Sequence, residues 1–284
     1  MKTLKTTFLL TALTLLLLGL GQAFGGQRGM TVALVFAVLM NGTAYFFSDK
    51  IALASSGAVP ISREQAPRFY AVMERLAAKA NLPMPKLYLI PQAAPNAFAT
   101  GRNPSHASVA ATQGLLELMN DDELEGVIAH ELSHVRNYDI LTSSIAATLA
   151  GAITWIAQMG RWGMIFGGWG GDEDRERGGG LTALLMLILA PIAAMLLQLG
   201  ISRQREYQAD ASGARMVGHP YGLISALEKL GAYNKKIPMD VPPTTSALMI
   251  VQPLTAGKVF SSLFSTHPPL SERIAALRNM TVTR

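Results

Sequence analysis

The stretch from Val127 to Asp139, VIAHELSHVRNYD, predicts a helix that carries the chemically active residues of this chain. Its two histidines, His130 and His134, are four residues apart, so on a helix they lie one turn apart on one face and both imidazoles can reach a single ion. Glu131 leans toward the same opening and can take a proton from a water held there. The alternative is a surface helix with two solvated histidines, but a capped helix start and a downstream partner favour the metal site.

The helix start and the downstream partner are both readable in the sequence. Asn120 can cap the helix, with Glu123 at the capping-box position. The partner is Glu206, in the run REYQAD, because two histidines and a carboxylate are an established ligand set for a catalytic zinc that keeps one position open. Asp210 is one helical turn further on and would accept the N–H of His130. Taken alone, this run favours surface ion pairs; with the first motif it predicts ligation.

The other three histidines have different settings. His267 precedes two prolines and the last predicted helix. This rigid setting suits a hydrogen-bond donor to the transition state, although packing against the helix is the alternative. Tyr207 is a second candidate for that donor. His106 and His219 lie in turns beside Ser or Pro and are predicted to be surface residues.

The composition points to a membrane. Of 284 residues, 50% are hydrophobic and only 15% charged, and mean hydropathy is +0.28, whereas a soluble domain has about a quarter charged residues. There is no cysteine, which excludes disulfides and thiolate chemistry, so any metal must bind His, Asp or Glu. The net charge of +5 is not gathered in a basic block, so nucleic-acid binding is not predicted.

Four stretches without charge are long enough for a membrane helix, which needs about 20 residues. The first could instead be a cleaved signal peptide, since Lys2 and Lys5 precede a Leu-rich run. The third is rich in Ala, Thr and Ser and could be a buried helix. The four predicted spans are Thr6–Gln27, Gly29–Ser48, Ile140–Gly160 and Gly178–Ser202.

The spans divide the chain into four predicted parts: a membrane hairpin (1–48), the first part of a catalytic domain (49–139), a second hairpin (140–202) and the rest of the catalytic domain (203–284). Basic residues near both termini place the polar parts in the cytoplasm by the positive-inside rule. The Gly-rich link around Asp172–Arg177 would then face the other side.

The polar parts predict a mainly α fold with a small β-sheet. Apolar residues recur at helical spacing in Glu64–Ala80, around Tyr221–Leu230 and around Leu270–Leu277. Ile237–Lys258 is rich in Pro and predicts a loop. Short strands are predicted at Lys86–Ile90, Asn96–Thr100 and Ser108–Thr112.

Within the second strand, a run of small and apolar residues is predicted to be an exposed edge. An exposed edge strand can bind an extended peptide by strand addition. A position inside the sheet is the alternative. The candidate substrate-binding residues are Asn96, Ala97 and Phe98, followed by Ala99.

Four motifs in this order around a membrane hairpin resemble the HtpX family of membrane-bound zinc endopeptidases, which are bacterial heat-shock proteases related to the CAAX prenyl endoproteases. The resemblance covers nearly the whole chain. The motifs are PNAFATG (Pro95–Gly101), VIAHELSHVRNYD (Val127–Asp139), SRQREYQAD (Ser202–Asp210) and THPP (Thr266–Pro269).

The resemblance implies a zincin-type, gluzincin-like catalytic domain. It implies one Zn²⁺ per chain at His130, His134 and Glu206, with catalysis by Glu131. It also implies a multi-pass protein of the bacterial inner membrane, facing the cytoplasm, that clears damaged proteins under stress.

The distance of the motifs from the spans bears on the substrate. Only Val135–Asp139 separate His134 from the third span, and Glu206 follows the fourth span closely, so the ion would lie near the membrane surface. Such a site reaches membrane-proximal loops and unfolded segments. The predicted partners are protein substrates and the lipid bilayer; the oligomeric state stays open. The alternatives are a metal-binding adaptor without hydrolysis and a processing enzyme for prenylated or secreted peptides.

Overall fold

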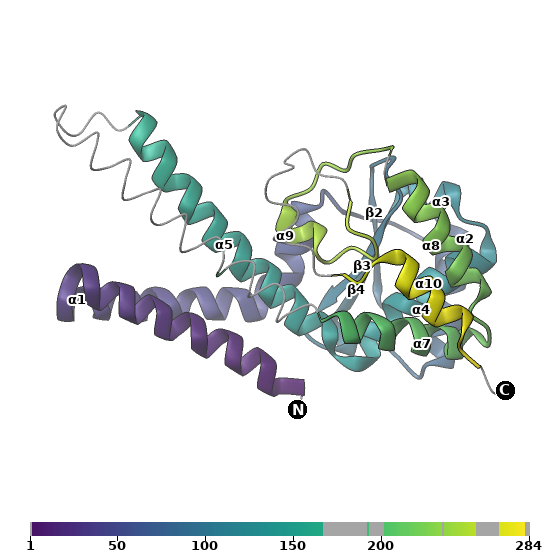
Figure 1. Ribbon diagram of the computed structural model, residues 1–284, viewed down its shortest axis with the longest axis horizontal. Coiled ribbons are helices and arrows are strands. Elements are labelled where there is room, and N and C mark those ends of the chain that lie inside the picture. The colour runs from purple at the N-terminus through teal and green to yellow at the C-terminus, as the bar shows by residue number, and fades with distance from the viewer. Residues whose placement is uncertain (1, 167–191, 193–201, 235, 254–266, 282–284) are drawn as a thin grey trace.

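The computed structural model describes residues 2–166, 192, 202–234, 236–253 and 267–281 (Figure 1). The acidic link Asp172–Arg177 and nearly all of the predicted fourth span, Gly178–Ser202, lie outside the described residues, as do the end of the predicted loop Ile237–Lys258 and Thr266 of the THPP motif.

Helix α1 (Lys2–Ser55) is a hairpin of two helical limbs that projects from the rest of the molecule (Figure 1). The chain reverses at Gly26, which has a φ of 54° and a ψ of −144°. Residues with a Cβ atom rarely adopt this backbone conformation. The limbs touch just before this turn, where a Cβ on Gly29 would lie 2.2 Å from the carbonyl oxygen of Gly21. The two predicted N-terminal spans are therefore antiparallel helices in contact.

One helix among the described residues, Gly25–Ser55, is long and apolar enough to cross a membrane; it has 31 residues. It contains the predicted second span. The apolar parts of the first and third spans that the structure describes, Thr6–Gly19 and Asp139–Ile153, are helical but shorter. Four membrane crossings therefore stay a prediction.

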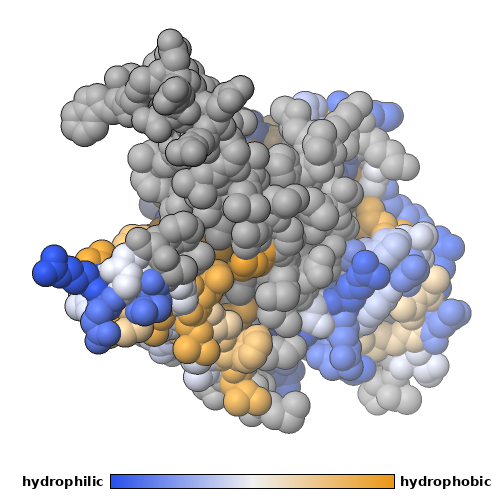
Figure 2. All heavy atoms as spheres, turned by 60° about the vertical axis from the view of Figure 1, so that its left-hand side comes forward, coloured by the Kyte–Doolittle hydropathy of each residue, from blue (hydrophilic) through white to orange (hydrophobic). Residues whose placement is uncertain are grey.

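The surface of α1 is apolar where it projects. Figure 2 shows hydrophobic residues, in orange, gathered in the lower part of the view, with hydrophilic residues on both sides of them. Large exposed apolar side chains of α1 include Val32, Val35, Val38, Leu39 and Phe46. An exposed apolar band between two polar ends matches a helix that is solvated by lipid.

A four-stranded mixed sheet lies in the other part of the molecule, with strand order β1-β2-β4-β3. Strands β2 and β4 are parallel, and the other two neighbouring pairs are antiparallel. All three predicted strands are present within one residue of their predicted ends. The strands are β1 (Val59–Pro60), β2 (Lys86–Ile90), β3 (Ala97–Gly101) and β4 (Ala107–Thr112).

Helices make up most of the described chain. The predicted helices at Tyr221–Leu230 and Leu270–Leu277 are confirmed, and so is the one predicted at Glu64–Ala80, except that it begins at Pro67. The predicted Pro-rich loop contains one short helix. The remaining elements are α2 (Pro67–Lys79), a 3₁₀ turn (Pro104–His106), α3 (Gln113–Leu118), α4 (Asp121–Asn137), α5 (Asp139–Phe166), α7 (Arg203–Val217), α8 (Tyr221–Asn234), α9 (Pro243–Ser246) and α10 (Leu270–Arg278).

Helix α4 is the centre of the fold. It contacts α2, α5, α7, α8 and strand β3, and its apolar residues Val127, Ile128 and Leu132 are fully buried in the main core. Helix α7 comes especially close, because a Cβ on its Gly213 would lie 2.9 Å from the backbone nitrogen of His130. This close packing brings the polar start of α7 against the two histidines of α4.

Candidate metal centre

The N-terminus of α4 has the predicted capping box. The side chain of Asn120 accepts a hydrogen bond from the Glu123 backbone N–H at 2.9 Å, and Glu123 accepts one from the Asn120 N–H at 2.9 Å. Lys229 and Ser225 of α8 also donate to the buried Glu123 carboxylate, at 2.7 and 2.6 Å. Loss of such a cap typically costs about 1 kcal/mol. The cap fixes the start of the helix and therefore the direction in which its histidines point.

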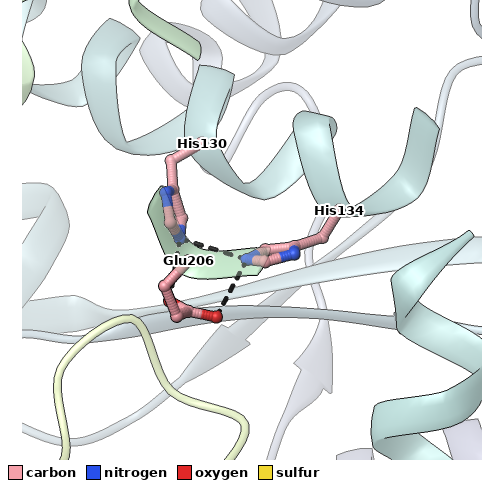
Figure 3. A group of neighbouring side chains, drawn as sticks. All are labelled: His130, His134 and Glu206. Carbon is pink, nitrogen blue, oxygen red and sulfur yellow. Dashed lines mark hydrogen bonds and ion pairs between the residues drawn. The ribbon is translucent and has the colours of Figure 1, made fainter. Parts of the chain in front are cut away.

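Three predicted ligand residues come together, as Figure 3 shows: His130 and His134 from α4, and Glu206 from α7. The Nε2 atoms of the two histidines are 3.2 Å apart. The Glu206 carboxylate lies 3.7 Å from Nε2 of His130 and 3.5 Å from Nε2 of His134. One donor atom from each residue lies within 4.8 Å of both others, so a single ion can bind all three.

The donor set fits zinc. Two nitrogens bound tetrahedrally at about 2.0–2.1 Å from zinc lie about 3.3 Å apart, close to the 3.2 Å between the histidines. Oε2 of Glu206 is buried and, within the described part of the chain, has no donor in hydrogen-bond geometry. A buried carboxylate oxygen without a partner is costly, and a cation would satisfy it.

Charges around the site also favour a cation. Burial alone would lower the pKa of His134, but the carboxylates of Glu206, Asp139 and Glu131 outweigh it and raise this pKa to about 9. Burial alone would raise the pKa of Glu206, but His267 and His134 hold it well below its usual range. In the metal-free site, the surrounding carboxylates therefore favour the doubly protonated ring of His134, and a bound ion would displace the second proton.

Asp210 lies where the sequence predicted. Its Oδ1 is 2.8 Å from Nδ1 of His130, so the imidazole donates Nδ1–H to Asp210 and turns Nε2 toward the other two ligands. Arg273 of α10, which is fully buried, donates to both oxygens of Asp210, from Nε at 2.8 Å and from Nη2 at 2.7 Å. Its Nη1 donates to the carbonyl of Ile250 at 2.7 Å. Asp210 is thereby held in one orientation.

Arg273 was not predicted to be a site residue, although its position in the sequence carries a signal. On the predicted last helix, Arg273 is three residues after Leu270 and four before Leu277, so it shares the apolar face that those leucines form. A charged residue on a buried face needs a charged or polar partner. That partner is Asp210.

His134 has a carboxylate partner as well. Nδ1 of His134 lies 3.4 Å from Oδ2 of Asp139, the first residue of α5, and Oδ1 of Asp139 lies 3.3 Å from Nη1 of Arg205. Neither of these two contacts was predicted from the sequence. Each of the two histidines therefore faces the other ligands with Nε2 and an aspartate with Nδ1.

Glu131 points to the same region from α4, between helix and sheet. Burial raises its pKa to about 7, and the nearby Glu206 charge acts in the same direction. His134 and the backbone N–H of Ala99, which hydrogen-bonds to the carboxylate, act against this shift. A carboxyl group that titrates near neutral pH can both accept and return a proton.

His267, the predicted transition-state donor, lies beside the ligand residue Glu206, and its ring contacts two oxygen atoms. Nδ1 is 3.2 Å from Oε2 of Glu206 without hydrogen-bond geometry, and Nε2 is 3.1 Å from the carbonyl oxygen of Ala247. If Nε2–H donates to that carbonyl, Nδ1 can donate only when the ring carries a second proton. The hydroxyl of Tyr207, the second candidate, donates at the surface to Glu272 at 2.8 Å.

Strand β3 is at the sheet edge, but the predicted exposure of this edge was wrong. Asn96, Ala97 and Phe98 are all buried. The segment at 250–251 covers Asn96 and Ala97, and Phe98 packs in an apolar cluster with Ile90, Ala110 and Met249. The Ile250 N–H donates to the carbonyl of Ala97 at 2.9 Å, and the Asn96 side chain donates to the carbonyl of Val251 at 2.7 Å. Their role in substrate binding stays a prediction, and it requires this segment to move aside.

The two remaining histidines lie outside the cluster. His106 is exposed, as predicted, and its ring nitrogens contact Asn103 and Arg102. His219 is half-buried and stacks on Tyr221 with ring centroids 5.7 Å apart. Its contact with a neighbouring ring explains why it is less exposed than predicted.

Comparison with known proteins shows which family this chain resembles. The pattern of peptidase family M48 matches residues 63–281. A "Protease HtpX homolog" of Desulfatibacillum aliphaticivorans is 57% identical over 273 residues, which cover 96% of this chain and 88% of that protein. Another, from Syntrophotalea carbinolica, is 52% identical over 283 residues, covering 99% of this chain and all of that protein.

A solved structure is similar in fold. The crystal structure of S. mikatae Ste24p matches with a TM-score of 0.53 and 22% identity. The match covers 97% of this chain but 64% of that one, so this chain spans less than two thirds of the length of Ste24p.

Proposed function

Since this chain belongs to peptidase family M48 and to its HtpX proteases, we propose that it is a membrane-anchored, zinc-dependent endopeptidase that degrades misfolded or damaged proteins. The observation that carries this proposal is the cluster of His130, His134 and Glu206, with Glu131 on the same helix. Family membership makes the protein a peptidase. The zinc, the residue roles and the substrate class are the proposal's own.

In this proposal, the three ligand residues hold zinc, which when bound polarises a peptide carbonyl and makes water more acidic. Glu131 accepts the proton of the attacking water and returns it to the leaving amine nitrogen. A pKa of about 7 suits both steps at neutral pH. The buried Nδ1 of His267 is the proposed donor to the developing negative charge of the carbonyl oxygen.

The proposed location follows from the same contacts. Helix α5 begins at Asp139, directly after the helix that carries the histidines, and its first turns pack against the α1 hairpin. The site would therefore lie near the membrane surface, where it reaches membrane-proximal and unfolded segments. We place the catalytic domain in the cytoplasm and the anchor in the inner membrane, because Lys2 and Lys5 lie at the end of the hairpin opposite its turn at Gly26.

Removal of the metal tests the enzymatic proposal. Purified full-length protein in detergent is expected to cleave casein, to lose this activity with a chelator and to regain it with stoichiometric Zn²⁺. The readout is the appearance of casein fragments together with the metal content of the protein. A protein that binds Zn²⁺ but cleaves no casein in any of the three conditions would favour the alternative of a non-hydrolytic adaptor.

The orientation can be tested with single cysteines, because the chain has none. A Gln27→Cys variant places an exposed thiol next to the hairpin turn, and Ser105→Cys places one in the catalytic domain. A membrane-impermeant maleimide is expected to label position 27 in intact spheroplasts and position 105 only after lysis. The reverse pattern would place the catalytic domain outside the cytoplasm.

A further inference from the structure

We infer that Asp139 is a positioning residue for the metal ligand His134 and that Arg205 fixes Asp139 in place. The inference rests on the proposed function, in which His134 binds zinc. It adds a second carboxylate–imidazole pair to the one formed by Asp210 and His130. It also makes the first residue of α5 part of the metal centre.

The ring of His134 has two nitrogens with different surroundings. Nε2 faces His130 at 3.2 Å and Glu206 at 3.5 Å, on the side where the ion would bind. Nδ1 faces Oδ2 of Asp139 at 3.4 Å. When the ring is neutral, an Nδ1–H donated to Asp139 leaves the lone pair on Nε2, which is the form that coordinates a metal. Asp139 thus selects the tautomer and the ring angle.

Arg205 occupies the other oxygen of Asp139. Its Nη1 lies 3.3 Å from Oδ1, and both side chains are only 13% exposed. The positive charge of Arg205 balances the negative charge of Asp139, so burial of the pair does not leave an uncompensated charge. Arg273 pairs with Asp210, the carboxylate beside the other imidazole, through two hydrogen bonds of 2.8 and 2.7 Å. Two separate Arg–Asp pairs therefore each orient one imidazole.

The backbone holds Asp139 firmly. Tyr138 has a left-handed conformation, with φ 62° and ψ 21°, which ends α4 and turns the chain so that the next side chain returns toward His134. Helix α5 then begins at once. Its Ser144 hydrogen-bonds to Thr100 of strand β3 at 2.7 Å in a buried contact. A positioning group is effective when it stands on rigid elements, and this helix start is attached to both α4 and the sheet.

The experiment compares the zinc affinity of full-length variants in detergent by competition with a chromogenic chelator. Asp139→Ala is expected to bind zinc about 10- to 100-fold more weakly than the parent. Asp139→Asn keeps an acceptor oxygen of the same shape and is expected to lose less. The matched control is Asp122→Ala. It removes an exposed aspartate in the first turn of α4, and it should leave the zinc affinity unchanged.

A spectrum separates positioning from a general structural role. In Co²⁺-loaded protein, Asp139→Ala is expected to change the energy and intensity of the visible bands, because the angle of one ligand changes. The melting temperature in the presence of chelator shows whether the variant is folded. If Asp139→Ala is unfolded, the zinc affinity and the Co²⁺ spectrum of Asp139→Asn test the inference instead.

The outcomes distinguish the inference from the proposal beneath it. A folded variant with the affinity and spectrum of the parent would overturn the role of Asp139 while leaving the metalloprotease proposal intact. A parent protein that binds neither Zn²⁺ nor Co²⁺ would overturn both.

Discussion

Glu131→Gln is expected to abolish proteolysis while the purified protein keeps its zinc. The amide has nearly the shape of the carboxylate but cannot accept a proton from water, and loss of such a group typically costs about 100- to 10,000-fold in rate. Both imidazoles and Glu206 remain, so the metal content should stay stoichiometric. Casein cleavage and elemental analysis of the same preparation give the two readouts.

The stability of this variant gives a further check. Because burial raises the pKa of Glu131 from 4.5 to about 7, this group makes the native protein less stable as the pH rises from 4.5 to about 7, and the full cost is present at pH 8. The neutral glutamine removes this cost, so the metal-free variant should melt no lower than the parent at pH 8. The matched control is Glu125→Gln, at a half-buried position of the same helix that pairs with Arg75, and it should retain activity. Loss of zinc from Glu131→Gln would make Glu131 a ligand.

Glu206→Ala is expected to lose zinc and activity together. A direct ligand supplies a metal bond, whereas a partner of a ligand typically changes affinity by about 10- to 100-fold. Asp210→Ala should therefore bind zinc more weakly than the parent but more tightly than Glu206→Ala. The measurement is zinc affinity by chelator competition at one pH. Equal losses in the two variants would contradict this ranking, and full retention in Glu206→Ala would exclude Glu206 from the site.

His267→Ala completes the comparison, because it separates binding from catalysis. As a donor used in the transition state, His267 should lower kcat by about 100- to 1000-fold when removed and leave zinc affinity near that of the parent. His267 also lies 3.2 Å from the Glu206 carboxylate, so a loss of zinc would show that it holds this ligand instead. Activity within a few-fold of the parent would make it a packing residue.

Local patterns were predictable from the sequence because their physics is local. The capping box, the helical spacing of His130 and His134, and the strand at Lys86–Ile90 depend on residues within a few positions of one another. Apolar spacing also predicted that Glu64–Ala80 and Tyr221–Leu230 are helices. Long-range pairing of Glu206 with the histidines was accessible because a zinc site requires a third ligand.

The sequence by itself therefore determined the helices, the short strands and the residue types that can bind a metal. Only the tertiary structure decided which distant side chains orient them: Arg273 reaches Asp210 across 63 residues, and Arg205 reaches Asp139 across 66. It also decided that strand β3 is covered by the segment at 250–251 instead of being exposed. Neither the ion pairs nor the covered strand follows from sequence periodicity, because the burial of a charge or of a strand edge depends on what packs against it. In this fold, the packing is set by the close contact of α4 with α7 and with the sheet.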